Sequence, residues 1–184
     1  DRNRPGSVGQ MLPDMEWRVD PVAGIETGGR LYLRGPNVMA GYISADDPER
    51  LEMLKDGWHD TGDIVDIDAD GYVSILGRVK RFAKVGGEMI SLMAVEGLAS
   101  AVWPESRHAV VAVPDSRKGE KLVLVTDRMD ADSARLSEWA RSHGAPDLAV
   151  PKKIISVREV PVLGTGKTDY VAIQRMVEDD VAAA

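Results

Sequence analysis

The chain divides at a stretch that reads GRVKRFAKVGG over residues 77–87. Residues 1–79 hold 8 Lys and Arg against 15 Asp and Glu, so the whole formal charge of −7 lies in this part. Residues 80–184 hold 15 of each sign and are balanced. Such asymmetry predicts two units with different surroundings, and an acidic first unit disfavours a nucleic-acid ligand. The alternative explanation is that the charge of solvent-exposed residues varies along the chain without functional meaning.

Composition excludes several classes of protein. With 184 residues, 43% hydrophobic and 29% charged, the chain has the composition of a globular protein of about one domain and a fraction. No run of about eighteen apolar residues is present, so no membrane span is expected. The absence of cysteine excludes disulfides and thiolate metal sites, and three separated histidines, His59, His108 and His143, disfavour a histidine metal centre. The first residue is Asp1 and not Met, and no charged-then-apolar run follows it, so we expect the chain to be part of a longer protein.

Residues 1–79 have the pattern of β structure. Short apolar or alternating runs are bounded by Gly, Pro and Asp clusters, which mark turns. The step Asp70-Gly71 is typical of a tight hairpin, because Gly tolerates the positive φ that such turns require. The predicted strands are residues 17–19, 31–33, 64–67 and 72–76.

Residues 80–184 change to helical spacing. Ser91 can cap a helix whose apolar residues recur every three or four positions from Leu92 to Val102. Strands that alternate with helices after an all-β stretch predict a mixed α/β second domain. The other predicted elements are helices over 132–143, ended by Gly144, and 170–177, and strands over 108–113, 122–125 and 154–157.

The acidic run DIDADG at residues 66–71 opens like a calcium-binding EF-hand loop, whose oxygens ligate at alternate positions. The twelfth position of such a loop is a bidentate Glu, but here it is Gly77, and the flanks have the pattern of strands. A solvated hairpin is the preferred interpretation. A calcium-binding β module is the alternative, and it requires a calcium-dependent gain in heat stability that Asp68→Ala abolishes.

Four stretches together resemble the late motifs of the adenylate-forming acyl-activating superfamily, which contains acyl-CoA synthetases, luciferases and nonribosomal adenylation domains. They are GRLYLRGPNVMAGY at 29–42, WHDTGD at 58–63, GRVKRFAKVGG at 77–87 and PVLGTGK at 161–167. Within the superfamily, RFAKVGGEMISL at 81–92 and PVLGTGKTDY at 161–170 look most like the acyl-[acyl-carrier-protein] synthetase half of bifunctional 2-acylglycerophosphoethanolamine acyltransferases. Met89 departs from the pattern, since that position is often Arg in the superfamily.

The resemblance implies a mixed α+β fold, in which residues 1–79 are the β-rich end of a large AMP-binding domain and residues 80–184 are a small, mobile α/β lid domain. It implies that a fatty acid and ATP form an acyl-adenylate and pyrophosphate, and that the acyl group then passes to the phosphopantetheine thiol of an acyl carrier protein. The phosphate-binding loop and the ligands of the Mg²⁺ that accompanies ATP are expected before Asp1. The chain alone is therefore expected to be inactive. The whole protein is expected to be cytoplasmic, with membrane association through an upstream domain as the alternative.

The resemblance also implies roles for individual residues. Joining a carboxylate to the α-phosphorus of ATP brings two anions together, and a lysine ammonium between them stabilises the transition state. Lys167 matches the family's catalytic lysine. Asp63 and Arg78 match residues that reach the ribose hydroxyls, and Ile75 matches an apolar contact to the nucleotide. Without the resemblance, the four are interpreted as an exposed turn lysine, a strand-end turn, a surface arginine and a core isoleucine.

Further roles concern domain movement and the acceptor. Lys80 lies at the family's hinge position, about which the small domain rotates between the two half-reactions. Gly87 matches the loop that lines the tunnel for the pantetheine arm, and a tight turn is its alternative interpretation. Carrier proteins of this type are strongly acidic, so a basic cluster would speed their association. The predicted docking residues are Arg81, Lys84, Lys118 and Lys121, with Arg117 beside them.

Two alternative functions remain open from the sequence. One is a CoA ligase of the same superfamily, in which free CoA is the acceptor. The other is a non-catalytic module that docks an acidic protein through the basic cluster.

Overall fold

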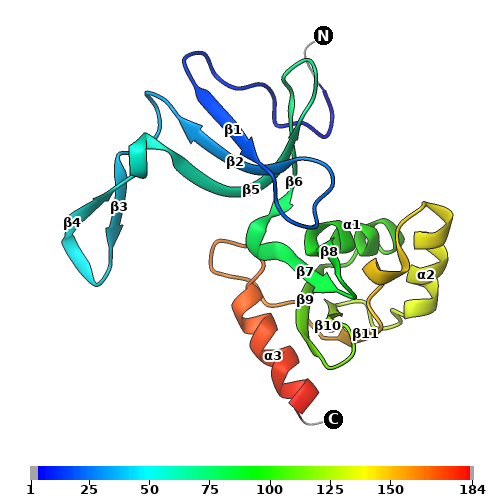
Figure 1. Cartoon of the computed structure of the whole chain (residues 1–184). Helices are drawn as coiled ribbons and strands as arrows, with labels where there is room; N and C mark the ends of the chain where they lie inside the picture. The colour runs from blue at the N-terminus through cyan, green and yellow to red at the C-terminus, as the bar shows by residue number, and fades with distance from the viewer. Residues whose placement is uncertain (1–3, 183–184) are drawn as a thin grey trace. The chain divides into compact units, whose positions relative to one another are not determined.

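The computed structural model describes residues 4–182. The chain forms two compact units, and the boundary between them falls between Lys80 and Arg81. Each unit has its own sheet (Figure 1). Each unit also has its own buried core. No helix within the described residues is long and apolar enough to cross a lipid bilayer.

The first unit is built on a four-stranded antiparallel sheet (Figure 1). Its buried core is small and centres on Leu31, Val65 and Val73, with Met11, Val19, Leu33 and Ile67 packed against it. The four predicted strands all overlap strands of this sheet, so the predicted β character is confirmed. In spatial order the strands are β1 (Glu16–Asp20), β2 (Gly29–Arg34), β5 (His59–Ile67) and β6 (Val73–Arg78).

A separate hairpin pairs β3 (Gly41–Ser44) with β4 (Asp47–Met53), and a short 3₁₀ turn, η1 (Lys55–Gly57), follows it. The sequence pattern does not reveal this hairpin, because every residue of β4 is exposed and no apolar alternation marks it. A Cβ at position 41 would lie 2.0 Å from the carbonyl oxygen of Glu52, so the close approach of the two strands requires Gly41.

The second unit is a mixed sheet with helices on both faces. β9 (His108–Asp115) and β10 (Gly119–Thr126) pair antiparallel over their whole length, and β11 (Lys153–Ser156) runs parallel to β10. A hairpin of β7 (Phe82–Val85) and β8 (Glu88–Ser91) joins the end of β10 through the pair Gly119 and Val85. The 3₁₀ turns η2 (Val79–Arg81) and η3 (Asp147–Ala149) precede β7 and β11.

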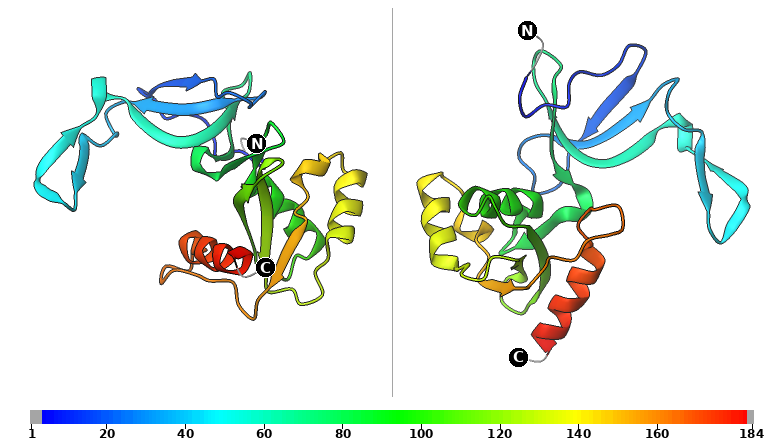
Figure 2. Two further views of the ribbon diagram at one scale, coloured as in Figure 1. Left: turned by 60° about the horizontal axis from the view of Figure 1, so that its bottom comes forward. Right: turned by 180° about the vertical axis from the view of Figure 1, so that it is seen from behind.

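Three helices cover this sheet: α1 (Leu92–Val102), α2 (Ser133–Ser142) and α3 (Tyr170–Ala182). α1 and α2 share one buried core with Val110, whereas α3 packs on Val111 and Val113 from the other side. Neighbouring residues of a strand face opposite ways, so β9 supplies both cores. Figure 2 shows α3 alone on its side of the sheet. The predicted mixed fold class, β-rich first and α/β second, is confirmed.

Local signals explain where the helices begin. The Ser91 hydroxyl accepts a hydrogen bond from the Ala94 backbone N–H at 3.3 Å, and the Asp132 carboxylate accepts one from Arg135 N–H at 2.9 Å. α3 continues five residues beyond the predicted end at Val177, because neither Gly nor Pro follows that residue. The β7–β8 hairpin was not expected from the pattern, since each of its strands has only four residues.

Candidate functional site

Asp63 and Arg78 lie opposite each other on neighbouring strands. They are register partners of β5 and β6, and Arg78 Nε lies 3.0 Å from Asp63 Oδ1. The Asp63 side chain is 18% exposed, whereas the Arg78 side chain is 68% exposed. The Asp70-Gly71 turn, with Gly71 at φ +80°, joins the two strands, and a register shift between Ile64 and Val65 brings Asp63 opposite Arg78. The two predicted ribose residues are therefore brought together within the first unit, with a carboxylate acceptor beside a guanidinium donor.

The stretch of β5 that carries Asp63 is held by side-chain hydrogen bonds to the backbone. Thr61 Oγ1 donates to the Leu31 carbonyl at 2.9 Å and accepts from Asp63 N–H at 3.1 Å. Asp60 Oδ1 accepts from Gly62 N–H at 3.0 Å, and the same carboxylate forms an ion pair with Arg30. The hydrogen bond from Arg30 is the main reason that the pKa of Asp60 lies below its ordinary value. These contacts give the Asp63 backbone a defined position before any ligand binds.

Ile75, the predicted apolar contact, lies on β6 and is 41% exposed. Its interpretation as a core residue is therefore wrong. Lys80 is the last residue of the first unit and lies in η2.

Lys167 lies on an exposed loop that precedes α3 in the second unit. Leu163 N–H donates to the Lys167 carbonyl at 2.7 Å, and Gly166 N–H donates to the Leu163 carbonyl at 2.8 Å. Asp169 N–H closes the loop by donating to the Pro161 carbonyl at 2.9 Å. Gly166 has φ +81°, which a residue with a Cβ rarely adopts. The loop is thus a hydrogen-bonded turn that presents Lys167 on its outer side.

Gly86 and Gly87 form the turn between β7 and β8, with φ of +62° and +96°. Two successive positive φ values are what a two-residue hairpin turn requires, so the turn alone explains both glycines. No other heavy atom lies within 4 Å of where a Cβ of Gly87 would be, so this side of the turn is open. Gly86 N–H donates to the Lys118 carbonyl at 2.9 Å, which ties the turn to the loop between β9 and β10.

A cavity of about 240 Å³ lies beside this turn. Its floor is apolar and its rim carries four lysines, two of which, Lys118 and Lys121, are predicted docking residues. The other two, Lys152 and Lys153, were missed, because they are some thirty positions away in the sequence and only the packing of β11 on β10 brings them near. The floor consists of Val85, Leu122, Leu148 and Val150, and Asp147 completes the lining.

Arg81 does not belong to this exposed surface, and its predicted role in docking needs correction. Its side chain is 18% exposed and forms an ion pair with Glu96, which is 14% exposed. Arg81 Nη1 also donates to the Val110 carbonyl at 2.9 Å. Its charge is therefore satisfied inside the second unit. Lys84 is exposed, as docking requires, but does not line the cavity, and the same holds for Arg117.

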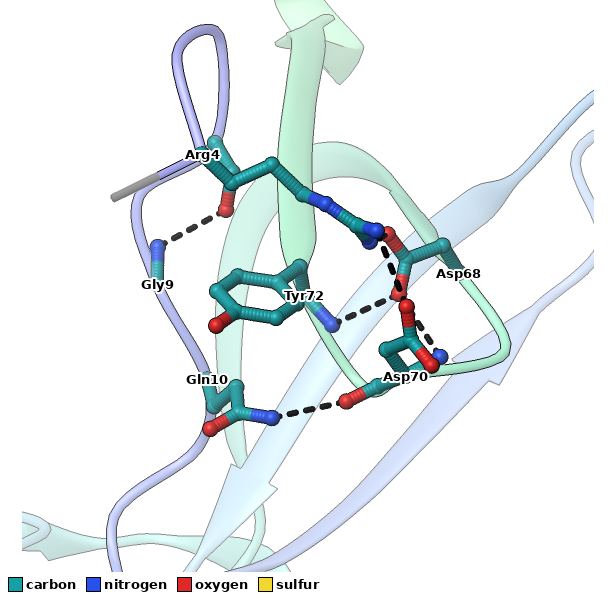
Figure 3. Close-up of polar contacts among 7 residues, drawn as sticks. Arg4, Gly9, Gln10, Asp68, Asp70 and Tyr72 are labelled. Atoms are coloured by element: carbon teal, nitrogen blue, oxygen red, sulfur yellow. Dashed lines mark hydrogen bonds and ion pairs between the residues drawn. The ribbon is translucent and has the colours of Figure 1, made fainter. Parts of the chain in front are cut away.

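The acidic turn at residues 66–71 is occupied by an arginine of the same chain (Figure 3). Arg4 forms ion pairs with Asp68 and Asp70, and its guanidinium carbon lies 4.7 Å from the centre of the Tyr72 ring. Asp68 Oδ1 also accepts from the backbone N–H groups of Asp70 and Tyr72 at 2.9 and 3.0 Å. Within residues 4–182, no group of three or more His, Asp or Glu side chains is placed to hold a metal ion. The turn is thus built as a hairpin closed by arginine, which disfavours the calcium-binding alternative.

Known proteins and solved structures include relatives of this chain. No protein-family model matches the chain. The chain is 32% identical over 169 residues to 2-hydroxy-7-methoxy-5-methyl-1-naphthoate–CoA ligase of Streptomyces carzinostaticus, which covers 88% of this chain and 30% of that protein. It is 31% identical over 157 residues to 2,3-dihydroxybenzoate-AMP ligase of Bacillus subtilis (strain 168), which covers 84% of this chain and 29% of that protein. ATP-bound MatB from Rhodopseudomonas palustris has a TM-score of 0.76 and 32% identity over 95% of this chain and 36% of the MatB chain.

The chain spans about 30% of the length of the curated relatives it matches. The matches cover most of both units and agree in sequence and in fold. The chain is therefore homologous to the AMP-dependent acyl- and aryl-CoA ligases of the adenylate-forming superfamily and has the fold of a fragment of such an enzyme.

Proposed function

We propose that the chain is part of an ATP-dependent acid–thiol ligase, which joins a carboxylic acid to AMP and then transfers the acyl group to a thiol. The observation that carries this proposal is the pair of Asp63 and Arg78 on adjacent strands. A ribose diol presents hydroxyl groups that donate to a carboxylate and accept from a guanidinium, so one pair serves both functions. Exposed Ile75 on the same strand as Arg78 offers an apolar contact for the nucleotide.

In this proposal Lys167 supplies the positive charge for the first half-reaction. Its ammonium group would lie between the attacking carboxylate and the α-phosphate, where it offsets the repulsion of two anions and stabilises the charge that develops. Lys80 would serve as the hinge about which the second unit, as a mobile lid, moves between half-reactions. Any Mg²⁺ that accompanies ATP would be held by the phosphates and by residues of the parent protein outside this chain.

For the acceptor we propose an acyl carrier protein, and for the acid a fatty acid, so that the parent enzyme is a fatty acyl-[acyl-carrier-protein] synthetase. The support is the lysine-rimmed cavity next to Gly86 and Gly87, where an acidic carrier would find Lys118, Lys121 and Lys152 around an apolar floor, whereas Lys153 is paired with Asp180. Open space at Gly87 would let the pantetheine arm pass close to the backbone.

CoA is the second candidate acceptor. The names of relatives favour it, since the Streptomyces relative is a CoA ligase. Lys118, Lys121 and Lys152 would also suit the phosphates of CoA.

The test uses the whole parent protein. Lys167→Ala should lower acyl-adenylate formation about 100- to 1,000-fold, as expected for loss of a group that stabilises transition-state charge. Lys55→Ala, which removes another exposed turn lysine, is the control and should leave the rate unchanged. Unchanged adenylation in Lys167→Ala would refute the enzymatic proposal and favour a docking module.

The acceptor is tested by comparing carrier protein with CoA in the second half-reaction. Lys118→Glu with Lys121→Glu should raise the KM for carrier protein about tenfold, without changing adenylation. Faster transfer to CoA than to carrier protein would refute the carrier-protein proposal. The chain alone should form no acyl-hydroxamate from ATP, palmitate and hydroxylamine.

A further inference from the structure

Three side chains from distant parts of the second unit meet in one cluster: Arg81, Glu96 and Tyr170, here called the Arg81 cluster. Glu96 lies on α1 and its Oε2 accepts a hydrogen bond from the Tyr170 hydroxyl at 3.1 Å. Its other oxygen accepts from Val110 N–H at 2.8 Å and forms the ion pair with Arg81. The Arg81 guanidinium carbon lies 3.7 Å from the centre of the Tyr170 ring. Every member therefore contacts both others.

The Arg81 cluster reaches the Lys167 loop through the start of α3. Tyr170 is the first residue of α3 and lies three positions after Lys167. Asp169, between them, caps the helix by accepting from Val171 and Ala172 N–H groups at 3.1 and 3.0 Å, and its own N–H bonds to Pro161 at the start of the loop. The loop tip is exposed, so its base at Asp169 and Tyr170 is where the rest of the unit can fix it.

The Arg81 cluster also contains the first residue of the second unit. Arg81 follows Lys80 directly and is the first residue of that unit. Arg81 contacts α1, β9 and α3. The same contacts therefore hold the start of the second unit and the base of the Lys167 loop.

We propose that Tyr170, held by Arg81 and Glu96, is a positioning residue that sets the place of Lys167 relative to the body of the second unit. This inference rests on the proposed role of Lys167 in adenylation. The ring is held by cation–π attraction in a partly desolvated site, and the hydroxyl fixes its rotation through Glu96. Loss of the ring frees the base of the loop, so that Lys167 samples positions in which its ammonium does not reach the reacting groups.

The test compares Tyr170→Leu and Tyr170→Phe in the whole parent protein. We expect Tyr170→Leu to lower the kcat of acyl-adenylate formation about tenfold, while transfer from preformed acyl-adenylate to the thiol changes less than about twofold. Tyr170→Phe keeps the ring over Arg81 and should restore most of the rate. A purely structural role would lower both half-reactions equally, by reducing the folded fraction, and that result would overturn the proposal.

Hydrogen–deuterium exchange gives a readout that does not depend on activity. Peptides that cover residues 161–169 should exchange faster in Tyr170→Leu than in wild type, with little change elsewhere in the second unit. Val171→Ala, at the exposed next position of α3, is the matched control and should change neither exchange nor rate. Unchanged exchange in Tyr170→Leu would overturn the inference. If Lys167→Ala keeps the full rate of adenylation, the proposed function itself is refuted. If Lys167→Ala lowers that rate but Tyr170→Leu does not, only the positioning role of Tyr170 is refuted.

Discussion

Replacing Glu96 by Gln should destabilise the second unit, because it removes the counter-ion of a largely buried arginine. The carboxylate is 14% exposed and accepts from Arg81, from Val110 N–H and from the Tyr170 hydroxyl. Gln keeps the shape and one acceptor oxygen. It removes the negative charge opposite the Arg81 guanidinium, 18% exposed, which keeps the Val110 carbonyl and the Tyr170 ring as uncharged partners.

The expected cost follows from this burial. Removing one partner of a fully buried ion pair costs about 3–5 kcal/mol, and an exposed pair contributes about 1 kcal/mol or less. Arg81 lies near the buried end of this range but keeps one hydrogen bond, so we expect a loss of about 2–3 kcal/mol in unfolding free energy. At a typical urea m-value this lowers the unfolding midpoint by about 1 M, and it lowers Tm by about 10 °C.

Urea unfolding followed by tryptophan emission, to which Trp103, 3% exposed in the core of this unit, contributes, measures the effect. Glu138→Gln on the exposed face of α2 is the control and should change stability by about 0.5 kcal/mol or less. A double-mutant cycle with Arg81→Met isolates the pair, and we expect a coupling energy of about 1–3 kcal/mol. If the stability losses of the two single variants add up to the loss of the double variant within about 0.5 kcal/mol, the claim that Arg81 and Glu96 stabilise each other is refuted.

Two further predictions concern pH. Arg30 lowers the pKa of Asp60, so this carboxylate contributes stability that is present above its ordinary pKa of 3.8 and is lost as pH falls through the lowered value. The stability difference between wild type and Asp60→Asn, measured by unfolding of the first unit, should therefore shrink between about pH 5 and pH 2, and a constant difference would contradict this. Burial, reinforced by the charge of Glu96, raises the pKa of Tyr170 above 10.0. The neutral phenol therefore contributes its full share of folding stability below pH 10.0, and this share is lost as pH rises through the raised pKa. In urea titrations above pH 10.0, wild type should therefore lose stability relative to Tyr170→Phe.

Much of the fold was predictable from local signals. Apolar spacing and the caps at Ser91 and Asp132 predict α1 and α2, and the Asp70-Gly71 turn predicts the β5–β6 hairpin. The β3–β4 hairpin was not predictable, because its β4 residues are all exposed and leave no hydrophobic period.

The candidate site divides in the same way. Asp63 and Arg78 lie on the two strands of one predicted hairpin, so the turn brings them near each other, but the register shift between Ile64 and Val65 that makes them direct partners was not predictable. The lysine-rimmed cavity and the inward direction of Arg81 were not predictable, since Lys152 and Tyr170 reach them only through the packing of the sheet and α3.

By itself, the sequence determined the local elements, the division near Lys80 and the resemblance carried by the motifs, because these depend on residues close together in the chain. Only the tertiary structure decided which charged side chains are exposed and can contact a partner. Arg81 and Lys118 look alike in the sequence, but Glu96 and Tyr170, the latter 89 positions from Arg81, bury one of them while the other remains on the cavity rim. The reason is physical: the state of a charge depends on the partners and the solvent around it, and for Arg81 packing supplies both.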